Sequence, residues 1–541
     1  MRPRIRWSVV AALLALAPST AQAVAPDKAV VRYAQKHPGQ NVQVIVQFKP
    51  GVSQQAARAT IRAWRGKPGQ ALPIIRGLAV KIPARSAASL VRAHGVRAVT
   101  LNSSVASTDD RRSSRPNRDR LQTQFNKVVR SDSFWDKATG NGVGVAVIDT
   151  GISGDLPDFQ GGQSGYSDRS AGWNGGSSRV IASVVTNPDA TTANDTYGHG
   201  THVAGIIAGN SADRNGNDPF YSDYAGVAPD ANLISIKASD DQGNSSVIDV
   251  INGIAFAIAY KDQLNIRVLN MSLQSATPGS YLTDPLDAAV EAAWRAGIVV
   301  VVASGNRGSS ADALQYAPSN DPYVITVGAV SDGGTGKVEN ATVSSFSGRG
   351  RTQDGFSKPD VYAPGQGIVS NLAPNSTFTT LCPTCIIGGQ YIRASGTSMA
   401  APVVSGVSAL LLQMHSDWTP DQVKGSLLSS THRGRDGSGV VDVGKANDQR
   451  DKKLISNVGL TPNPAAADMM ANAAIDPTRS SWSRSSWSRS SWSQASGDLA
   501  ASWARSSWSC TCSQSSGGVV DPTRSSWSRS SWSTYFGDDT E

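Results

Sequence analysis

The hydrophobic positions of the longest part of the chain fall into apolar runs separated by amphipathic segments. Four runs are rich in apolar residues, most of them β-branched or leucine, and are followed by glycine or polar residues, the pattern of strands buried on both faces of a parallel sheet. These runs are 142–151, 231–239, 266–273 and 297–306. Helical periodicity in the intervening residues 246–260 and 284–297 completes a strand–helix alternation. We therefore predict an α/β domain with a doubly wound, mostly parallel sheet over residues 131–449.

A smaller unit with a different rhythm precedes this domain. VQVIVQFK, GLAVKIP and VRAVTLN read as three strands, and segments of helical period lie between them. This order predicts a compact α+β unit over about residues 41–107, within a domain that we place at 24–110. It contains no constellation of reactive groups, so we expect a folding or inhibitory module.

The first 23 residues have the pattern of a secretory signal peptide. Arg2, Arg4 and Arg6 precede the short apolar run VVAALLALA, and Ala21-Gln22-Ala23 supplies small residues for cleavage. The run is too short to span a bilayer, and no later run of suitable length lacks charge and glycine. We expect a secreted, extracellular protein without a transmembrane anchor; the periplasm and the cell surface are the alternatives.

The chain carries a net charge of +8, but the excess is not evenly spread. Residues 107–130 hold seven basic and three acidic side chains, with no aromatic residue among the arginines of 111–120. Nucleic-acid-binding surfaces combine basic charge with a recognisable motif or stacking residues. We therefore predict that residues 111–130 form an exposed basic linker and that nucleic acid is not a partner.

Residues 450–541 lose all periodicity and become rich in serine and tryptophan. The pentapeptide RSSWS begins at six arginines, and DPTRSSWSRSSWS occurs twice. Tracts of this composition bury too little apolar surface to offset the entropy of ordering. We predict a disordered low-complexity tail, and regularly spaced tryptophans leave open that it adheres at the cell surface to a sugar polymer, a membrane interface or another protein.

Candidate chemistry centres on Ser398 in ASGTSMAAP, at the start of an apolar helix. A hydroxyl there lies at the positive end of the helix dipole, near backbone N–H groups that have no partner within the helix. His199, flanked by glycines in YGHGTHVAG, can act as its base, whereas His202 is better explained as a packed structural residue. Asp149 ends a buried strand, where an unpartnered carboxylate would be costly, and can orient the histidine. Asn306 ends another strand and can donate to an oxyanion.

Together these motifs resemble the subtilisin-like serine proteases. The chain order Asp149, His199, Ser398 and the motifs VIDTGI, GHGTHVAG, NMSL, ASGN and GTSMAAP carry the resemblance over about residues 131–446. It implies a secreted serine endopeptidase that hydrolyses peptide bonds through an acyl-enzyme, needs no cofactor for the chemistry and acts on proteins or peptides.

The resemblance extends to the small α+β unit and to the substrate contacts. The unit resembles the ferredoxin-like propeptide of such enzymes, which implies a zymogen that processes itself and is inhibited by its own propeptide; the segment between Ser107 and Arg120 is the expected cut region. Ser272 and Leu273 would pair with the substrate backbone. Ala303, Ser304 and Gly305 would form the opposite wall.

Calcium commonly stabilises the family, and two positions match its sites. Asp360, with the carbonyl groups of Pro322 and Val324, matches one site. Asp158 matches a ligand of another, although the loop that would carry its partners differs. Asp360 is our candidate calcium ligand.

Two features depart from or add to the family pattern. Gln274 and Ser275 follow Leu273 where the family has two glycines, so we predict a narrower or more polar pocket for the residue before the scissile bond.

Cys382 and Cys385 are close enough in sequence for a loop disulfide; a zinc site with Cys510 and Cys512 is the alternative.

Two readings from outside this class remain as alternatives. An adhesion or surface protein with an inactive protease-like domain is disfavoured by the intact catalytic set. A lipase-type hydrolase is disfavoured by the chain order of that set and by Ala400, where its nucleophile turn needs glycine.

Overall fold

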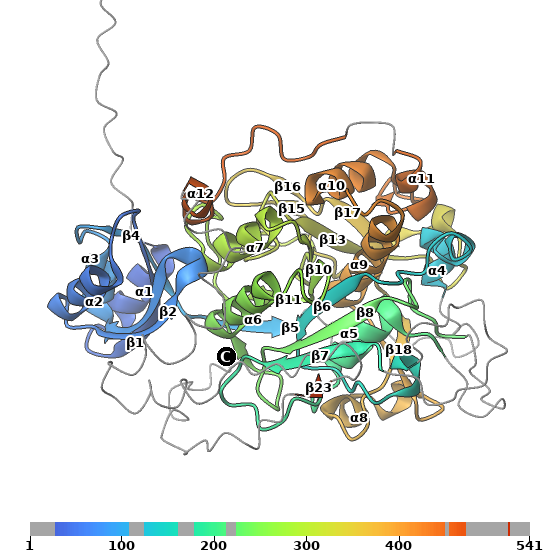
Figure 1. The fold of residues 1–541 in the computed structure, drawn as a ribbon, viewed down its shortest axis with the longest axis horizontal. Coiled ribbons are helices and arrows are strands. Elements are labelled where there is room, and N and C mark those ends of the chain that lie inside the picture. The colour runs from blue at the N-terminus through green and yellow to red at the C-terminus, as the bar shows by residue number, and fades with distance from the viewer. Residues whose placement is uncertain are drawn as a thin grey trace, which may run out of the picture.

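The computed structural model describes residues 27–107, 124–160, 178–211, 223–449, 454–471 and 518–519. The two largest sheets within them differ in kind, a small antiparallel one and a large, mostly parallel one (Figure 1). The predicted signal peptide, residues 111–123 of the predicted linker and most of the predicted tail lie outside the described residues.

The small unit is an antiparallel sheet of order β2-β3-β1-β4 covered by helices, which is the ferredoxin-like arrangement. Its elements are α1 (Lys28–Lys36), β1 (Asn41–Phe48), α2 (Gln54–Ala63), β2 (Lys67–Leu72), β3 (Gly77–Pro83), α3 (Ala84–Leu90) and β4 (Val96–Leu101). The three expected strands are β1, β3 and β4. We missed β2 because Pro68 and Gly69 break its pattern, and α1 because it precedes the apolar rhythm.

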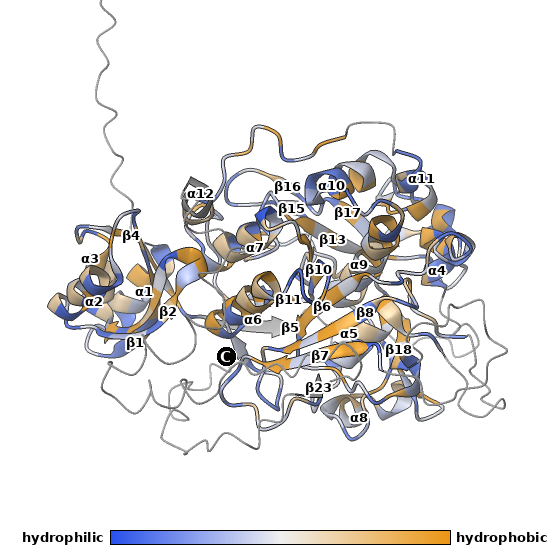
Figure 2. Cartoon of the chain, viewed as in Figure 1, coloured by the Kyte–Doolittle hydropathy of each residue, from blue (hydrophilic) through white to orange (hydrophobic). Residues whose placement is uncertain are grey.

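The large sheet is parallel through its seven central strands, as expected, in the order β17-β13-β12-β10-β6-β8-β7. These are β6 (Gly144–Asp149), β7 (Val180–Val185), β8 (Asn232–Lys237), β10 (Ile266–Met271), β12 (Val299–Ala303), β13 (Ile325–Ser331) and β17 (Val361–Pro364). Figure 2 shows the apolar character of these inner strands. The winding direction reverses between β6 and β10, and parallel sheets place functional groups beyond the carboxyl ends at such a point.

Short strands extend or flank this sheet. They are β14 (Thr342–Val343), β15 (Gly350–Arg351), β16 (Ser357–Lys358), β18 (Ile368–Asn371), β19 (Ile386–Ile387), β20 (Tyr391–Ala394), β21 (His432–Arg433), β22 (Gly439–Val440) and β23 (Gly518–Val519). Three further strands, β5 (Ser104–Ser107), β9 (Ser245–Ser246) and β11 (Leu273–Ser275), form a separate small sheet.

Two pairs of helices pack on the parallel sheet, α6 with α7 and α5 with α9. The helices of the larger domain are α4 (Phe125–Val129), α5 (His199–Ala208), α6 (Val247–Ala259), α7 (Pro285–Arg295), α8 (Thr377–Leu381), α9 (Thr397–Met414), α10 (Pro420–Ser429), α11 (Val443–Asn447) and α12 (Pro464–Ala471). Figure 1 shows the small unit beside α6 and α7. In the described part of the chain, α9 alone has the length and hydropathy of a membrane span, and it lies buried in the core.

The predicted linker extends too far toward the carboxyl terminus. Residues 125–129 form α4, whose Phe125 and Val129 are buried in the core of the larger domain. The side chain of Asn126 donates to the carbonyl oxygen of Ala225 at 2.7 Å. We missed this helix because it is only five residues long and is flanked by basic residues.

The predicted tail begins too early. Asn463 donates its backbone N–H to the buried carboxylate of Glu291 at 2.8 and 3.0 Å, and Tyr281 donates its hydroxyl to the carbonyl oxygen of Thr461 at 2.7 Å. Helix α12 then packs on α7 and on residues 73–75 of the small unit. Polar hydrogen bonds, rather than a periodic apolar face, attach residues 454–471 to the larger domain. Hydrophobic periodicity therefore did not predict that this segment is ordered.

We predict that a chain ending at residue 475, which loses only the two-residue strand β23 at the sheet edge, unfolds at nearly the same temperature as the full chain. A chain ending at residue 449 should unfold at a clearly lower temperature. The shorter chain leaves the carboxylate of Glu291 buried without the Asn463 donor, and each lost buried hydrogen bond costs about 1–3 kcal/mol. Calorimetry of the three chains tests this. Equal unfolding temperatures for all three would contradict the packing role of residues 454–471.

Candidate active site

A buried carboxylate and a buried imidazole meet where the large sheet reverses its winding. Asp149 is the last residue of β6, and His199 is the first residue of α5. Oδ1 of Asp149 lies 2.6 Å from Nδ1 of His199, and both side chains are almost fully buried. A contact this short between a carboxylate and an imidazole fixes the ring orientation and favours a proton on Nδ1.

A second buried carboxylate, Asp195, frames this pair, and the sequence analysis missed it. It accepts the backbone N–H groups of Gly198 and Thr201 at 2.7 and 2.8 Å, at the start of α5. It also accepts the hydroxyl of Thr150, the residue after Asp149, at 2.8 Å. Burial raises the pKa of Asp195, and these hydrogen bonds oppose that shift. An aspartate four residues before the histidine, at a helix start, was the available signal.

Ser398 lies in the first turn of α9, as the sequence predicts. Its hydroxyl donates to the carbonyl oxygen of Ser272 at 3.2 Å, and the hydroxyl of Ser272 donates to the carbonyl oxygen of Ser398 at 2.9 Å. Asn270, which the sequence analysis also missed, joins both elements: it donates to Ser272 Oγ at 3.1 Å and accepts from Ser405 of α9 at 2.8 Å. The start of α9 is thus fixed to the carboxyl end of β10.

Asn306 lies beyond the carboxyl end of β12 and is held against the same helix start. Its Oδ1 accepts the backbone N–H and the hydroxyl of Thr397, each at 3.0 Å. These two hydrogen bonds to Oδ1 fix the orientation of the amide group relative to the start of α9. The expected wall residues Ala303, Ser304 and Gly305 lead into Asn306 from β12, and all three are buried.

A strand of the chain itself lies alongside the expected substrate-pairing strand. In β5, Ser107 is opposite Leu273 and Val105 is opposite Ser275, in antiparallel register. The other edge of β5 pairs with β9, where Val105 is opposite Ser245. Residues that join the small unit to the larger domain therefore occupy the space between two strand edges, next to the contact of Ser272 with Ser398.

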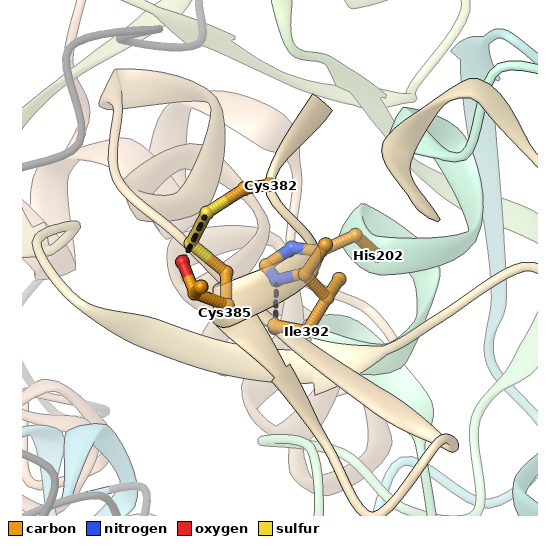
Figure 3. Close-up of a disulfide and its surroundings, with 5 residues drawn as sticks. His202, Cys382, Cys385 and Ile392 are labelled. Carbon is orange, nitrogen blue, oxygen red and sulfur yellow. Dashed lines mark hydrogen bonds between the residues drawn. A yellow bond between two sulfur atoms is a disulfide. The ribbon is translucent and has the colours of Figure 1, made fainter. Parts of the chain in front are cut away.

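The histidine one turn after His199 is structural, as expected. Nε2 of His202 lies 3.0 Å from the carbonyl oxygen of Ile392, and burial, aided by the nearby His199, lowers its pKa to about 3 (Figure 3). Cys382 and Cys385 form a disulfide beside it, so the loop disulfide rather than the zinc site is present. Cys385 packs in a cluster with Phe378, whose ring faces His199 edge-on at 6.1 Å between ring centres.

The residues around Asp360 do not fit a calcium site, because lysine side chains lie against the expected ligands. Lys358 Nζ lies 2.7 Å from Oδ2 of Asp360 and donates to the carbonyl oxygen of Val324 at 3.2 Å. Lys424 donates to the carbonyl oxygen of Pro322 at 2.6 Å. Burial lowers the pKa of Lys424 to about 8, while Asp360 opposes the shift. Two ammonium groups on the expected ligands would repel a divalent cation.

Asp158 does not fit a calcium site either. Its Oδ2 accepts from Asn371 at 2.8 Å and from the hydroxyl of Tyr391 at 3.0 Å. The fully buried Arg179 donates to its backbone carbonyl group, and burial lowers the pKa of this arginine to about 10. In the described ranges, no group of three or more histidine, cysteine or acidic side chains is arranged to hold a metal ion.

Comparison with known proteins agrees with the family that the motifs indicate. A family model described as "Subtilase family" matches residues 140–493, which is more than half of the chain. Fervidolysin from Fervidobacterium pennivorans, a keratinolytic enzyme related to subtilisin, has a similar structure, with a TM-score of 0.56 at 26% identity. The match covers 77% of this chain and 62% of fervidolysin.

Three bacterial proteases illustrate the sequence similarity. Serine protease AprX of Bacillus subtilis is 40% identical over 303 residues, covering 55% of this chain and 63% of AprX. Subtilisin E of Bacillus subtilis is 36% identical over 312 residues, covering 56% of this chain and 65% of that relative. Subtilisin of Bacillus pumilus is also 36% identical, over 56% of this chain and 90% of its own length. The chain thus spans slightly less than two thirds of AprX and subtilisin E.

We predict that a chelator leaves the unfolding temperature unchanged, whereas Lys424→Met lowers it. The substitution removes the ammonium group that the carbonyl of Pro322 and the carboxylate of Asp360 surround, and breaking a buried charge pair costs about 3–5 kcal/mol. Calorimetry in a calcium-free buffer measures both effects, with the exposed Lys337→Met as the matched control. A chelator that lowers the unfolding temperature of the unaltered chain would contradict the replacement of calcium by lysine.

Proposed function

The chain belongs to the subtilase family, and from this premise we propose that it is a secreted serine endopeptidase made as a self-processing zymogen. The observation that carries the proposal is the buried 2.6 Å contact of Asp149 with His199, the first residue of a helix that packs on the helix carrying Ser398. The relatives AprX and subtilisin E, both proteases by name, support the same activity.

In the proposed reaction, Ser398 is the nucleophile. Its Oγ bonds to the carbonyl carbon of the substrate while its proton passes to His199. Asp149 holds the imidazole through Nδ1 and stabilises the positive charge that develops on the ring. His199 then gives the proton to the leaving amine as the peptide bond breaks. The acyl-enzyme ester is hydrolysed by water, which loses a proton to His199, and Ser398 recovers its proton at the end.

Asn306 is proposed to stabilise the oxyanion of the tetrahedral intermediate. The two contacts of its Oδ1 with Thr397 support this role, because they fix the amide beside the start of α9. The backbone N–H of Ser398 lies in the first turn of the same helix, where the helix dipole favours negative charge. These two groups would both donate hydrogen bonds to the substrate oxygen on which negative charge develops.

Residues 24–110 are proposed to act as a propeptide that inhibits the enzyme until it is cut. The antiparallel register of β5 with β11 supports this role, since it resembles a substrate strand running along Leu273 toward Ser398. Ser272 and Leu273 would bind the substrate backbone, and Ala303, Ser304 and Gly305 would line the facing side. We expect the cut shortly after Ser107. Export would follow from the signal peptide, and the tail could contact the cell surface.

We predict that the unaltered chain shortens after synthesis and that Ser398→Ala stays whole, because the variant lacks the attacking oxygen. Intact mass spectrometry of the two purified proteins measures this. Ser408→Ala, on the same helix and bonded only to the carbonyl oxygen of Val404, is the matched control and is expected to shorten normally.

Two outcomes of that comparison would contradict the proposal. If both proteins stay whole, the domain does not process itself, and the adhesion alternative gains support. If both shorten, another protease cuts the chain, the shortening does not require Ser398, and a peptide-cleavage assay decides whether the domain is active.

We predict that Asn306→Ala lowers kcat by roughly 10²–10³, a range first established on a subtilisin, while KM changes by less than about threefold. The side chain is proposed to act only when negative charge develops, so ground-state binding is hardly affected. Steady-state kinetics on a peptide substrate separate the two constants. A change confined to KM would show that Asn306 binds substrate and does not stabilise the oxyanion.

A further inference from the structure

Gln274 lies where two neighbouring strands of the large sheet separate. β10 and β12 pair in parallel as far as Met271 and Val302. Beyond that point one strand continues through Ser272 into β11, and the other continues through Ser304 and Gly305. The side chain of Gln274 is buried between the two continuations.

The carboxamide of Gln274 is fixed in this position. Its Nε2 donates to Ser319 Oγ at 2.8 Å, and the hydroxyl of Ser319 in turn donates to the carbonyl oxygen of Tyr316 at 2.8 Å. The backbone of the next residue, Ser275, donates to the carbonyl oxygen of Ala317 at 2.7 Å. The side chain and its strand are therefore anchored to the same loop, and rotation of the amide out of this space would break the bond to Ser319.

The same carboxamide lies directly on Gly305. A Cβ atom built on Gly305 would come within 2.5 Å of Oε1 and 2.8 Å of Nε2 of Gln274. Gly305 cannot move back, because its carbonyl oxygen accepts the N–H of Gly348 at 2.8 Å. Its φ of +85° also requires glycine. The wall residue and the glutamine thus touch, and the amide fills space that a glycine at position 274 would leave open.

The chain's own strand in this place has matching chemistry. β5 has the sequence Ser-Val-Ala-Ser, and it runs antiparallel to β11 with its carboxyl end toward Ser272. No residue of this strand is larger than valine. The segment that pairs beside Gln274 is therefore composed only of small residues.

We propose that Gln274 sets the specificity of the enzyme by restricting the side chain before the scissile bond to small residues such as alanine, serine and threonine. This inference rests on the proposed endopeptidase activity and names its substrate class: extended segments rich in small residues. The glutamine acts by occupying volume, and its amide also leaves a polar surface that disfavours a large apolar ring. An enzyme with glycine at this position would have room for aromatic side chains.

The test compares the unaltered enzyme with Gln274→Gly on fluorogenic tetrapeptides Ala-Ala-Pro-Xaa, in which Xaa is alanine, serine, leucine or phenylalanine. We expect the unaltered enzyme to prefer alanine over phenylalanine by at least about tenfold in kcat/KM. We expect Gln274→Gly to raise kcat/KM for phenylalanine by about 10–200-fold, the range for opening a pocket by one or more methylene groups. The value for alanine should change by less than about threefold.

Two further variants keep the test decisive. Gln353→Gly, an exposed glutamine in the turn between β15 and β16, should leave the preference unaltered. Ser319→Ala removes only the anchor of the amide and should raise the phenylalanine value partway. If Gln274→Gly is misfolded, the Ser319→Ala result and the preference of the unaltered enzyme still decide the matter.

The outcomes separate this inference from the proposed function. A preference of the unaltered enzyme for phenylalanine, or a Gln274→Gly variant with unchanged ratios, would overturn the specificity role while leaving the endopeptidase intact. Failure of the unaltered, processed enzyme to cleave any of the peptides or a denatured protein would instead overturn the proposed function, and the inference would fall with it.

Discussion

The buried contact between Asp149 and His199 is the constraint on which the arrangement of the site depends. A carboxylate at the end of a buried strand is costly unless it is partnered, and this one has the imidazole at 2.6 Å and the N–H of Thr150 at 2.8 Å. That arrangement holds only if α5 begins at His199, and Asp195 fixes this start by accepting from Gly198 and Thr201. The pair therefore requires the strand, the helix start and the intervening loop to fold in one geometry.

Buried cationic side chains stabilise two further regions of the larger domain, around Asp360 and around Asp158. Lysine ammonium groups at Asp360 and a buried guanidinium at Asp158 lie where the family resemblance implied calcium. Lys424 extends this network to the carboxyl-terminal segment, since it also donates to Asn457 at 3.1 Å. A cation that belongs to the chain cannot dissociate, so this end of the sheet is held by covalently attached groups. The cost is the desolvation of a buried ammonium, which its carbonyl partners offset.

The sequence predicted the elements whose patterns are strong and local. Continuous apolar runs predicted β6, β8, β10 and β12, and the motifs around Ser398 and His199 predicted helices that begin at or next to those residues. Features held together by long-range polar contacts were missed: Asp195, Asn270 and residues 454–471 have no periodic signature. The sequence could not show how Asp360 is surrounded, because Lys358 is two residues away but only the fold brings Lys424 to it. A substitution such as Gln274 was visible in the sequence, but what its side chain fills required the structure.

The most direct measurement of the central claim is covalent labelling of the processed chain with a fluorophosphonate, followed by mass spectrometry of its peptides. Only a serine activated by a neighbouring base reacts quickly with such a reagent. The account predicts one label per chain, on Ser398, and its loss or strong slowing in His199→Ala and Asp149→Asn. Labelling of another serine, or a rate at Ser398 that neither substitution changes, would contradict the claim that these three residues act as one unit.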